Sequence, residues 1–136
     1  MIKKLKKLID TLKEKKQTLA LAESCSGGYA SYLLTKIPGV SEVFMGSVVV
    51  YSLEAKNKLF NIPSSLLEKT QGVSKEVALK LATEVRKKLN ANIGASIVGF
   101  AGPKTKKIII KGTRDVVRKK ASAHLIELIY KASVEI

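Results

Sequence analysis

The sequence predicts an α/β domain, specifically a layered α/β/α sandwich with a central mixed sheet. Short runs of apolar and β-branched residues alternate along the chain with stretches in which apolar residues recur every three or four positions, as strands alternate with helices. The 136 residues, 46% of them hydrophobic, are enough for one compact core, and no linker-like tract interrupts the pattern. We therefore expect residues 1–136 to form a single domain.

The chain should begin with an amphipathic helix, followed by a strand and a second helix. Residues 1–16 place lysines around one apolar stripe, which consists of Ile2, Leu5, Leu8, Ile9 and Leu12. We favour packing on a sheet over binding at a membrane surface, because this segment has no Trp or Phe anchor. Residues 18–22 form a short apolar run that predicts a strand, and helical spacing then extends from Tyr29 to Lys36.

The middle of the chain predicts one strand and three helices. Residues 43–51 are apolar and rich in β-branched side chains, which is typical of a central strand buried on both faces. Ser52 is expected to cap a short helix, and Ser65 with Glu68 three residues later predicts a second helix start of the capping-box type. Ser74 should begin a longer helix, because apolar residues then recur every four positions.

The last third is expected to contain two short strands and a helix. Residues 93–98 and 108–110 are the predicted strands, separated by a loop that begins at residues 99–103. Thr113 is a suitable N-cap for a C-terminal helix.

The formal net charge of +14 comes mainly from the two flanks of the chain. Residues 1–16 contain seven lysines, and residues 104–120 contain eight lysines or arginines. Such an excess attracts nucleic acid, acidic membranes or phosphorylated small molecules alike. We favour a solvated, lysine-coated surface over a nucleic-acid footprint, because neither flank carries aromatic residues that could stack on bases.

Two further features restrict the class of protein. No apolar stretch approaches the roughly 18 residues that cross a bilayer, so we expect no membrane partner. Cys25 and His124 are the sole residues of their types, which argues against a disulfide framework and against a structural zinc site. We expect a cytoplasmic protein that needs neither a metal nor another cofactor.

The turn at residues 23–28 is the first candidate site, because it lies where a strand leads into a helix. Backbone N–H groups and the positive end of the helix dipole favour anions at such a position. Gly27 and Gly28 allow a ligand to approach the backbone closely, and Ser24 and Ser26 supply hydroxyls. Taken alone this is a weak signal, since Ser and Gly are also ordinary capping residues.

A serine nucleophile requires a base, and the sequence offers two types. His124 follows the apolar spacing of the last helix and is expected to be packed in the core. Lys56 follows the predicted central strand, and burial there would lower its pKa enough for it to act as a base. Cys25 is a less favoured nucleophile, because no histidine neighbours it in the sequence.

Four segments together give a specific resemblance. They are AESCSGG at 22–28, GSVVVYSLEAK at 46–56, GVSKEVA at 72–78 and GFAGP at 99–103. In this order they resemble the C-terminal domain of the CinA family, over most of residues 18–103. The resemblance implies the fold of that domain and a stand-alone amidohydrolase that converts nicotinamide mononucleotide to nicotinic acid mononucleotide and ammonia.

The resemblance also implies roles for individual residues. Ser24 would be the nucleophile, Lys56 the general base, and Tyr51 the residue that aligns the two. The remaining residues would hold the oxyanion or the substrate, including its phosphate: Ser26, Gly27, Gly28, Gly99, Ala101, Gly102, Arg114 and Arg118. The implied partner is a small phosphorylated substrate.

The sequence departs from the family pattern at three points. Ser26 replaces the usual threonine, residues 104–106 replace a Gly-rich acidic loop, and the following Gly-Thr-Val strand has no counterpart. One alternative is therefore a non-catalytic module that binds a nucleotide or nucleic acid. A second is a subunit whose short sheet is completed by a copy of itself, and a homo-oligomer is expected on this ground.

Overall fold

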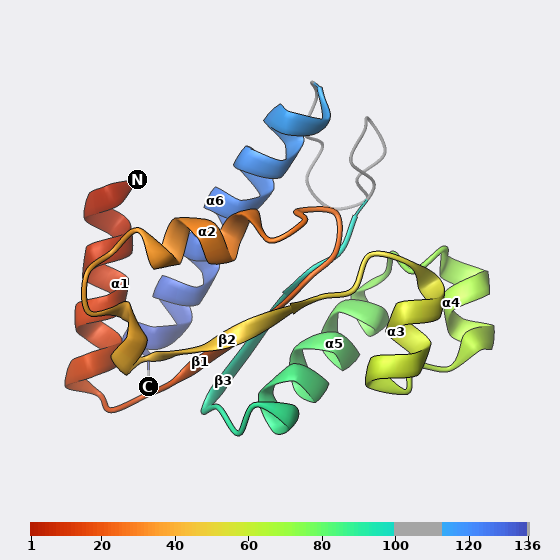
Figure 1. The fold of residues 1–136 in the computed structure, drawn as a ribbon, viewed down its shortest axis with the longest axis horizontal. Helices are drawn as coiled ribbons and strands as arrows, with labels where there is room; N and C mark the ends of the chain where they lie inside the picture. Colours follow the sequence, from red (N-terminus) through yellow and green to blue (C-terminus); the bar gives the residue numbers. More distant parts are fainter. Residues whose placement is uncertain (100–112, 136) are drawn as a thin grey trace.

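A computed structural model describes residues 1–99 and 113–135, and a parallel sheet lies at its centre (Figure 1). The described residues form three strands in the order β2-β1-β3. Their bounds are β1 Leu19–Glu23, β2 Phe44–Val49 and β3 Ile93–Ile97. All five residues of β1 are buried, as expected for a strand with a parallel neighbour on each side and helices on both faces.

Helices cover both faces of the sheet, so the α/β/α class is confirmed (Figure 1). One layer consists of α1 (Ile2–Glu14), α2 (Tyr29–Thr35) and α6 (Arg114–Val134). The other consists of α3 (Leu53–Phe60), α4 (Ser64–Thr70) and α5 (Lys75–Lys88). A short 3₁₀ helix, Val40–Glu42, leads into β2. The described strands are all parallel, whereas a mixed sheet was expected.

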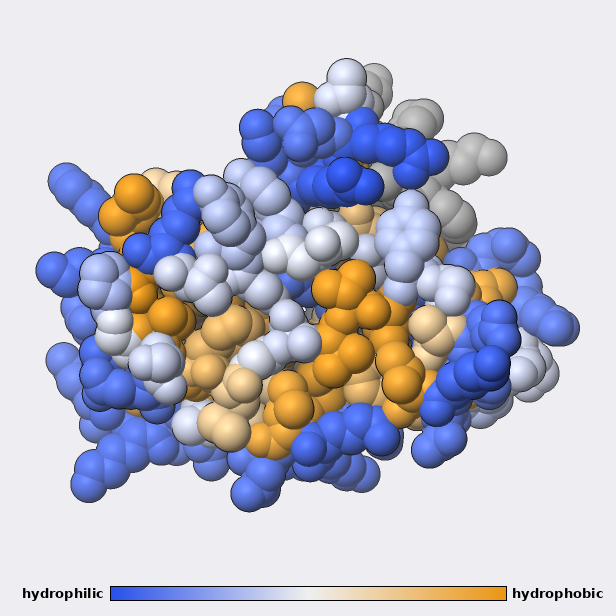
Figure 2. All heavy atoms as spheres, viewed as in Figure 1, coloured by the Kyte–Doolittle hydropathy of each residue, from blue (hydrophilic) through white to orange (hydrophobic). Residues whose placement is uncertain are grey.

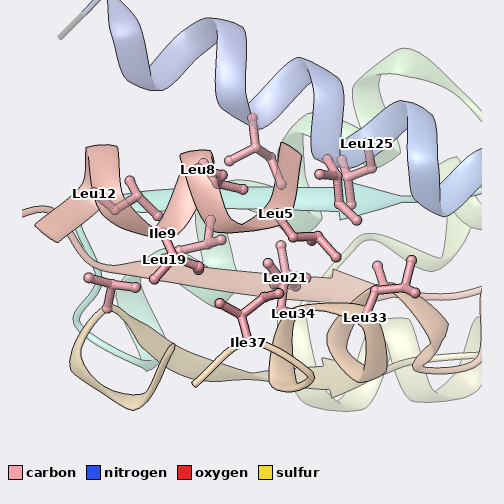
Figure 3. Packing of buried hydrophobic residues seen from close by; sticks show 14 of the residues in the cluster. Leu5, Leu8, Ile9, Leu12, Leu19, Leu21, Leu33, Leu34, Ile37 and Leu125 are labelled. Atoms are coloured by element: carbon pink, nitrogen blue, oxygen red, sulfur yellow. The ribbon is translucent and has the colours of Figure 1, made fainter. Parts of the chain in front are cut away.

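The alternation of side chains along β1 divides the core into two clusters. Leu19 and Leu21 pack with the layer of α1, α2 and α6, and Ala20 and Ala22 pack with the layer of α3, α4 and α5. Figure 3 shows the first cluster, in which leucines of α1 and α2 lie against those of β1. The small alanines on the opposite face allow α5 to lie close to the sheet.

The sequence predicts α1 and three helix starts correctly. Leu5, Leu8, Ile9 and Leu12 of α1 are buried, although Ile2 at the end of the stripe is 64% exposed. The three predicted caps are present: Ser52 and Ser74 each accept a hydrogen bond of 3.0 Å from the backbone N–H three residues later, and Thr113 accepts one of 3.3 Å from Val116.

The capping box predicted at Ser65 is wrong. Helix α4 begins at Ser64, which is one residue before the predicted cap, and Pro63 occupies the N-cap without a side-chain hydrogen bond. The fixed φ of proline favours a helix start directly after it, which places Ser65 inside the first turn.

The strand predicted at residues 43–51 is present as β2, but the prediction that it is central and buried on both faces is wrong. Strand β2 lies at an edge of the described sheet, and Met45 and Val49 are about half exposed, at 51% and 47%. Figure 2 shows apolar surface over this part of the molecule. The central strand is β1, because the chain adds β2 on one side of it and then crosses to add β3 on the other. The strand predicted at residues 108–110 lies outside the described residues.

No helix in residues 1–99 or 113–135 is long and apolar enough to cross a membrane.

Candidate active site

The candidate site lies at the carboxyl end of β1. Ser24 directly follows this strand, and the turn 24–28 leads into α2. Because β2 and β3 lie on opposite sides of β1, the chain leaves the sheet in opposite directions at this point. In open α/β sheets, ligands bind at such a reversal of strand order, beyond the carboxyl ends of the strands.

Ser24 and Lys56 meet at this position. The Nζ atom of Lys56 lies 2.9 Å from Oγ of Ser24, although the two residues are 32 positions apart in the sequence. Nζ also donates a hydrogen bond of 3.0 Å to the backbone carbonyl of Tyr51. Both side chains are almost fully enclosed, since Ser24 is 5% exposed and Lys56 3%. The serine and lysine predicted from the sequence are therefore a contacting pair.

The start of α3 determines the position of Lys56. Ser52 caps this helix, and its carbonyl accepts a hydrogen bond of 3.2 Å from the backbone N–H of Lys56. Gly72 lies against the lysine stem, because a Cβ at that position would be 3.7 Å from Cδ and Cε of Lys56. The aliphatic part of Lys56 is thus packed, and its amine is directed toward Ser24.

Burial lowers the pKa of Lys56 below its ordinary value of 10.5. None of the ion pairs among the described residues includes Lys56, so no carboxylate counteracts the loss of hydration. A lysine with a lowered pKa is a neutral amine more often at physiological pH, and a neutral amine can accept the proton of a serine hydroxyl.

Cys25 is a poor alternative nucleophile in this environment. Its side chain is buried among apolar residues of the first core cluster. Burial raises the pKa of the Cys25 thiol above 9.0, which disfavours the reactive thiolate.

The turn 24–28 presents backbone N–H groups beside Ser24. Gly27 and Gly28 have φ values of +62° and +97°, which side chains rarely permit. The N–H of Gly27 is occupied, because it donates a hydrogen bond of 3.0 Å to the carbonyl of Ser24. The N–H groups of Ser26 and Gly28 have no acceptor within the described parts of the chain. Of the three N–H groups predicted at this turn, those of Ser26 and Gly28 are therefore available to a ligand.

A pocket of about 350 Å³ opens beside the turn. It is lined by Ser26, Gly27, Gly28, Tyr29, Tyr32, Asp115 and Arg118. The Ser26 hydroxyl is fully buried and has no hydrogen-bond partner among the residues described. A buried hydroxyl without a partner favours a site in which a ligand supplies the missing hydrogen bond.

The two predicted arginines differ in position. Arg118 lines the pocket, and its Nε donates a hydrogen bond of 3.3 Å to the carbonyl of Cys25. Arg114 is exposed at the start of α6 and is not part of the pocket lining. Gly99 is partly buried beyond the end of β3, and Ala101 and Gly102 lie outside the described residues.

Two other expectations change. Tyr51 contacts Lys56 through its backbone carbonyl, while its side chain is 55% exposed, so the phenol is not what positions the lysine. His124 is exposed on α6 and does not pack in the core as expected. The apolar face of α6 is formed instead by Val117, Leu125, Ile126 and Ile129, which leaves His124 on the solvent side.

Sequence reasoning did not identify Glu23, which is 0% exposed and ends β1 directly before Ser24. Its carboxylate accepts hydrogen bonds from the first turn of α2. The sequence did contain a signal for this residue, because Glu23 ends a strand that is otherwise apolar. A buried carboxylate requires several hydrogen-bond donors, so an acidic residue at such a position indicates a network around it.

The sequence is similar to known proteins over most of its length. A family model described as the CinA C-terminal domain matches residues 2–114. A CinA-like protein of Amoebophilus asiaticus is 45% identical over 92 residues, which cover 68% of this chain and 22% of that protein. A protein of Alkaliphilus metalliredigens is 35% identical over an alignment of 153 residues, covering 96% of this chain and 36% of its own length. The chain thus spans about a fifth to a third of these relatives.

Solved structures share the fold. A CinA superfamily protein from Klebsiella pneumoniae superposes with a TM-score of 0.92 at 18% identity, covering 99% of this chain and 98% of that one. A competence or damage-inducible protein from Enterobacter asburiae superposes with a TM-score of 0.85 at 27% identity, covering 96% of each chain. The 153-residue alignment is longer than this 136-residue chain, so the Alkaliphilus relative contains residues that have no counterpart here.

Proposed function

Because this chain belongs to the CinA C-terminal domain family, we propose that it is an amidohydrolase that converts nicotinamide mononucleotide to nicotinic acid mononucleotide and ammonia. The observation that carries the proposal is the buried contact of 2.9 Å between Lys56 Nζ and Ser24 Oγ. A lysine with a lowered pKa beside a serine hydroxyl is the arrangement that a serine-lysine hydrolase requires.

The first half of the reaction forms an acyl-enzyme. The neutral amine of Lys56 accepts the hydroxyl proton as Ser24 Oγ attacks the carboxamide carbon. The carbonyl oxygen becomes an oxyanion, which the N–H groups of Ser26 and Gly28 can stabilise. The Lys56 ammonium then returns the proton to the amide nitrogen, the C–N bond breaks, and ammonia leaves.

The second half restores the enzyme. Water attacks the acyl carbon, and Lys56 takes a proton from it. The resulting intermediate breaks its bond to Ser24 Oγ, which regains a proton from Lys56, and the carboxylic acid is released. No metal ion takes part in any of these steps, since the lysine performs all the proton transfers.

The pocket beside the turn suits an anionic part of the substrate. Arg118 and Ser26 both line this pocket, and the Ser26 hydroxyl has no hydrogen-bond partner among the described residues. We assign the phosphate of the nucleotide to Arg118, because a guanidinium binds phosphate with charge-assisted hydrogen bonds. Arg114 is a more distant, exposed cation that can attract the substrate without binding it.

The excess basic charge favours a second candidate, a module that binds a nucleotide or nucleic acid without reacting with it. Salt-sensitive DNA binding by a protein that releases no ammonia from any pyridine nucleotide would select this candidate.

The test is ammonia release from nicotinamide mononucleotide by the purified protein and by its Lys56→Met variant. We expect the variant to lose activity by about a thousandfold or more, because serine loses its base. The matched control is Lys58→Met on the same helix, where the exposed lysine pairs with Glu54. Equal activity in Lys56→Met and Lys58→Met, or no ammonia from the parent protein, would overturn the proposal.

A further inference from the structure

The carboxylate of Glu23 is buried, and its hydrogen-bond donors among the described residues all come from α2. Its Oε1 accepts a hydrogen bond of 3.0 Å from the N–H of Ala30, and its Oε2 accepts one of 2.9 Å from the N–H of Ser31. The Ser31 hydroxyl also bonds to Oε2. None of the ion pairs in the described parts of the chain includes Glu23. These donors therefore replace the hydration that burial removes.

The hydrogen bonds around Glu23 extend to β2 through Ser31. The Ser31 hydroxyl bonds to Oε2 of Glu23, and its Oγ also lies 2.6 Å from Oγ of Ser47, within hydrogen-bond distance. One chain of hydrogen bonds thus joins β2, α2 and the end of β1.

This chain closes the turn that carries Ser24. Glu23 directly precedes the turn 24–28, and Ala30 and Ser31 lie in the first turn of the helix that follows it. The two positive-φ glycines within the turn lose much conformational freedom on folding, so the turn needs fixed ends. The backbone carbonyl of Glu23 also accepts a hydrogen bond of 2.8 Å from Val50, which fixes the strand side.

We propose that Glu23 is a positioning residue: by joining both ends of the turn, its carboxylate holds Ser24 against Lys56 and keeps the Ser26 and Gly28 N–H groups in place. Glu23 touches neither substrate nor reacting atoms, and the inference rests on the proposed serine-lysine chemistry. Glutamine has one acceptor oxygen and an NH₂ group in place of the second oxygen. In Glu23→Gln the NH₂ group would therefore face the N–H of either Ala30 or Ser31, and two donors cannot form a hydrogen bond. The turn would then shift while the sheet remains.

The test uses Glu23→Gln and Ser31→Ala with two readouts. The first readout is the pair of constants kcat and KM for ammonia release, measured separately. The second is the rate at which a fluorophosphonate labels Ser24, and this rate does not depend on the identity of the substrate. We expect Glu23→Gln to lower kcat and the labelling rate by roughly tenfold to a hundredfold, with KM within about threefold. Ser31→Ala, which keeps both backbone bonds, should lower the labelling rate by a smaller factor.

The control for a purely structural effect is Gly94→Ala, which disturbs the packing of β3 on α5 away from the turn. It should lower stability without changing the labelling rate of the folded protein. The proposal would be overturned if Glu23→Gln were labelled at the parental rate. It would also be overturned if Gly94→Ala, at the same stability as Glu23→Gln, showed the same decrease in labelling rate. If Glu23→Gln fails to fold, parental labelling of Ser31→Ala would overturn it. If the parent protein releases no ammonia but Glu23→Gln is still labelled more slowly than the parent, the positioning role of Glu23 is supported and only the proposed substrate is refuted.

Discussion

At the scale of single residues, the site depends on a lysine in an environment that disfavours its charge. Lys56 has one serine hydroxyl and one backbone carbonyl as hydrogen-bond acceptors. These two neutral groups stabilise an ammonium less than water does, and its pKa falls. The same burial therefore supplies a base for catalysis and costs stability while the amine is protonated.

The activity should increase with pH as Lys56 loses its proton. Only the neutral amine can accept the serine proton, so kcat/KM should rise toward a plateau with a midpoint below 10.5, the ordinary lysine value. A pH–rate profile with nicotinamide mononucleotide measures this midpoint. A profile that is flat across the neutral and alkaline range, or one that falls with rising pH, would exclude Lys56 as the base.

The stability of the protein should show the same titration. The pKa of Lys56 is lower in the folded state than in the unfolded state, so between these two values the unfolded chain binds more protons and stability rises with pH. The free energy of unfolding of the parent, relative to that of Lys56→Met, should be lowest below the folded-state pKa of Lys56. It should then rise until about pH 10.5. Urea unfolding of both proteins at several pH values measures the difference. A constant difference would contradict a lowered pKa.

At the scale of elements, the close approach of α5 to the sheet depends on one glycine. A Cβ at Gly94 in β3 would lie 2.1 Å from the carbonyl oxygen of Ala82 and 2.7 Å from Cβ of Arg86. The small residues on this face of the sheet thus let α5 pack closely, and the register of β3 beside β1 follows from that packing.

The substitution Gly94→Ala should be destabilising, by about 1–3 kcal/mol, because α5 must move away from the sheet. The comparison is Gly27→Ala, where a Cβ meets no atom within 4 Å and the cost arises from a φ of +62° alone, about 1 kcal/mol. Chemical denaturation gives both values. Equal stability of Gly94→Ala and the parent would show that the helix is not held at this distance.

The elements were largely predictable from the sequence, whereas their order in the sheet was not. The stripe of α1 and the caps at Ser52 and Ser74 are local patterns, and local patterns determined those elements. Whether β2 lies at the centre or the edge depends on how the chain crosses β1, and its uncharged, β-branched sequence suits both positions.

The candidate site was predictable in part for the same reason. The motifs identified Ser24 and Lys56, but no local pattern shows that Tyr51 acts through its carbonyl or that His124 faces solvent. Glu23 became recognisable only when α2 brought its donors to the end of β1. The roles of these three residues depend on contacts between segments that are distant in the sequence, and the spacing of residues along the chain does not reveal such contacts.

At the scale of the whole molecule, the +14 net charge produces a positive field around the protein. Such a field attracts the proposed phosphorylated substrate to the protein, where Arg118 lines the pocket beside the turn. Salt reduces this effect, because the Debye length falls from about 30 Å at 0.01 M to about 3 Å at 1 M.

The KM for nicotinamide mononucleotide should therefore rise by roughly threefold or more between low and high salt, with kcat nearly constant. Nicotinamide riboside, which lacks the phosphate and keeps the cationic pyridinium ring, serves as the comparison, and its KM should not rise with salt. Steady-state kinetics of ammonia release give both constants. The same salt dependence for both compounds would show that the field does not act through the phosphate.

In the proposed reaction Ser24, and not its neighbour Cys25, attacks the amide. The most direct measurement is ammonia release at saturating nicotinamide mononucleotide by Ser24→Ala and Cys25→Ala, each shown to be folded. We predict that Ser24→Ala loses activity by about a thousandfold or more while Cys25→Ala keeps most of it, because burial holds the thiol protonated. Loss of activity in Cys25→Ala with retention in Ser24→Ala would exclude Ser24 as the nucleophile, and a parent protein that releases no ammonia would exclude the proposed reaction.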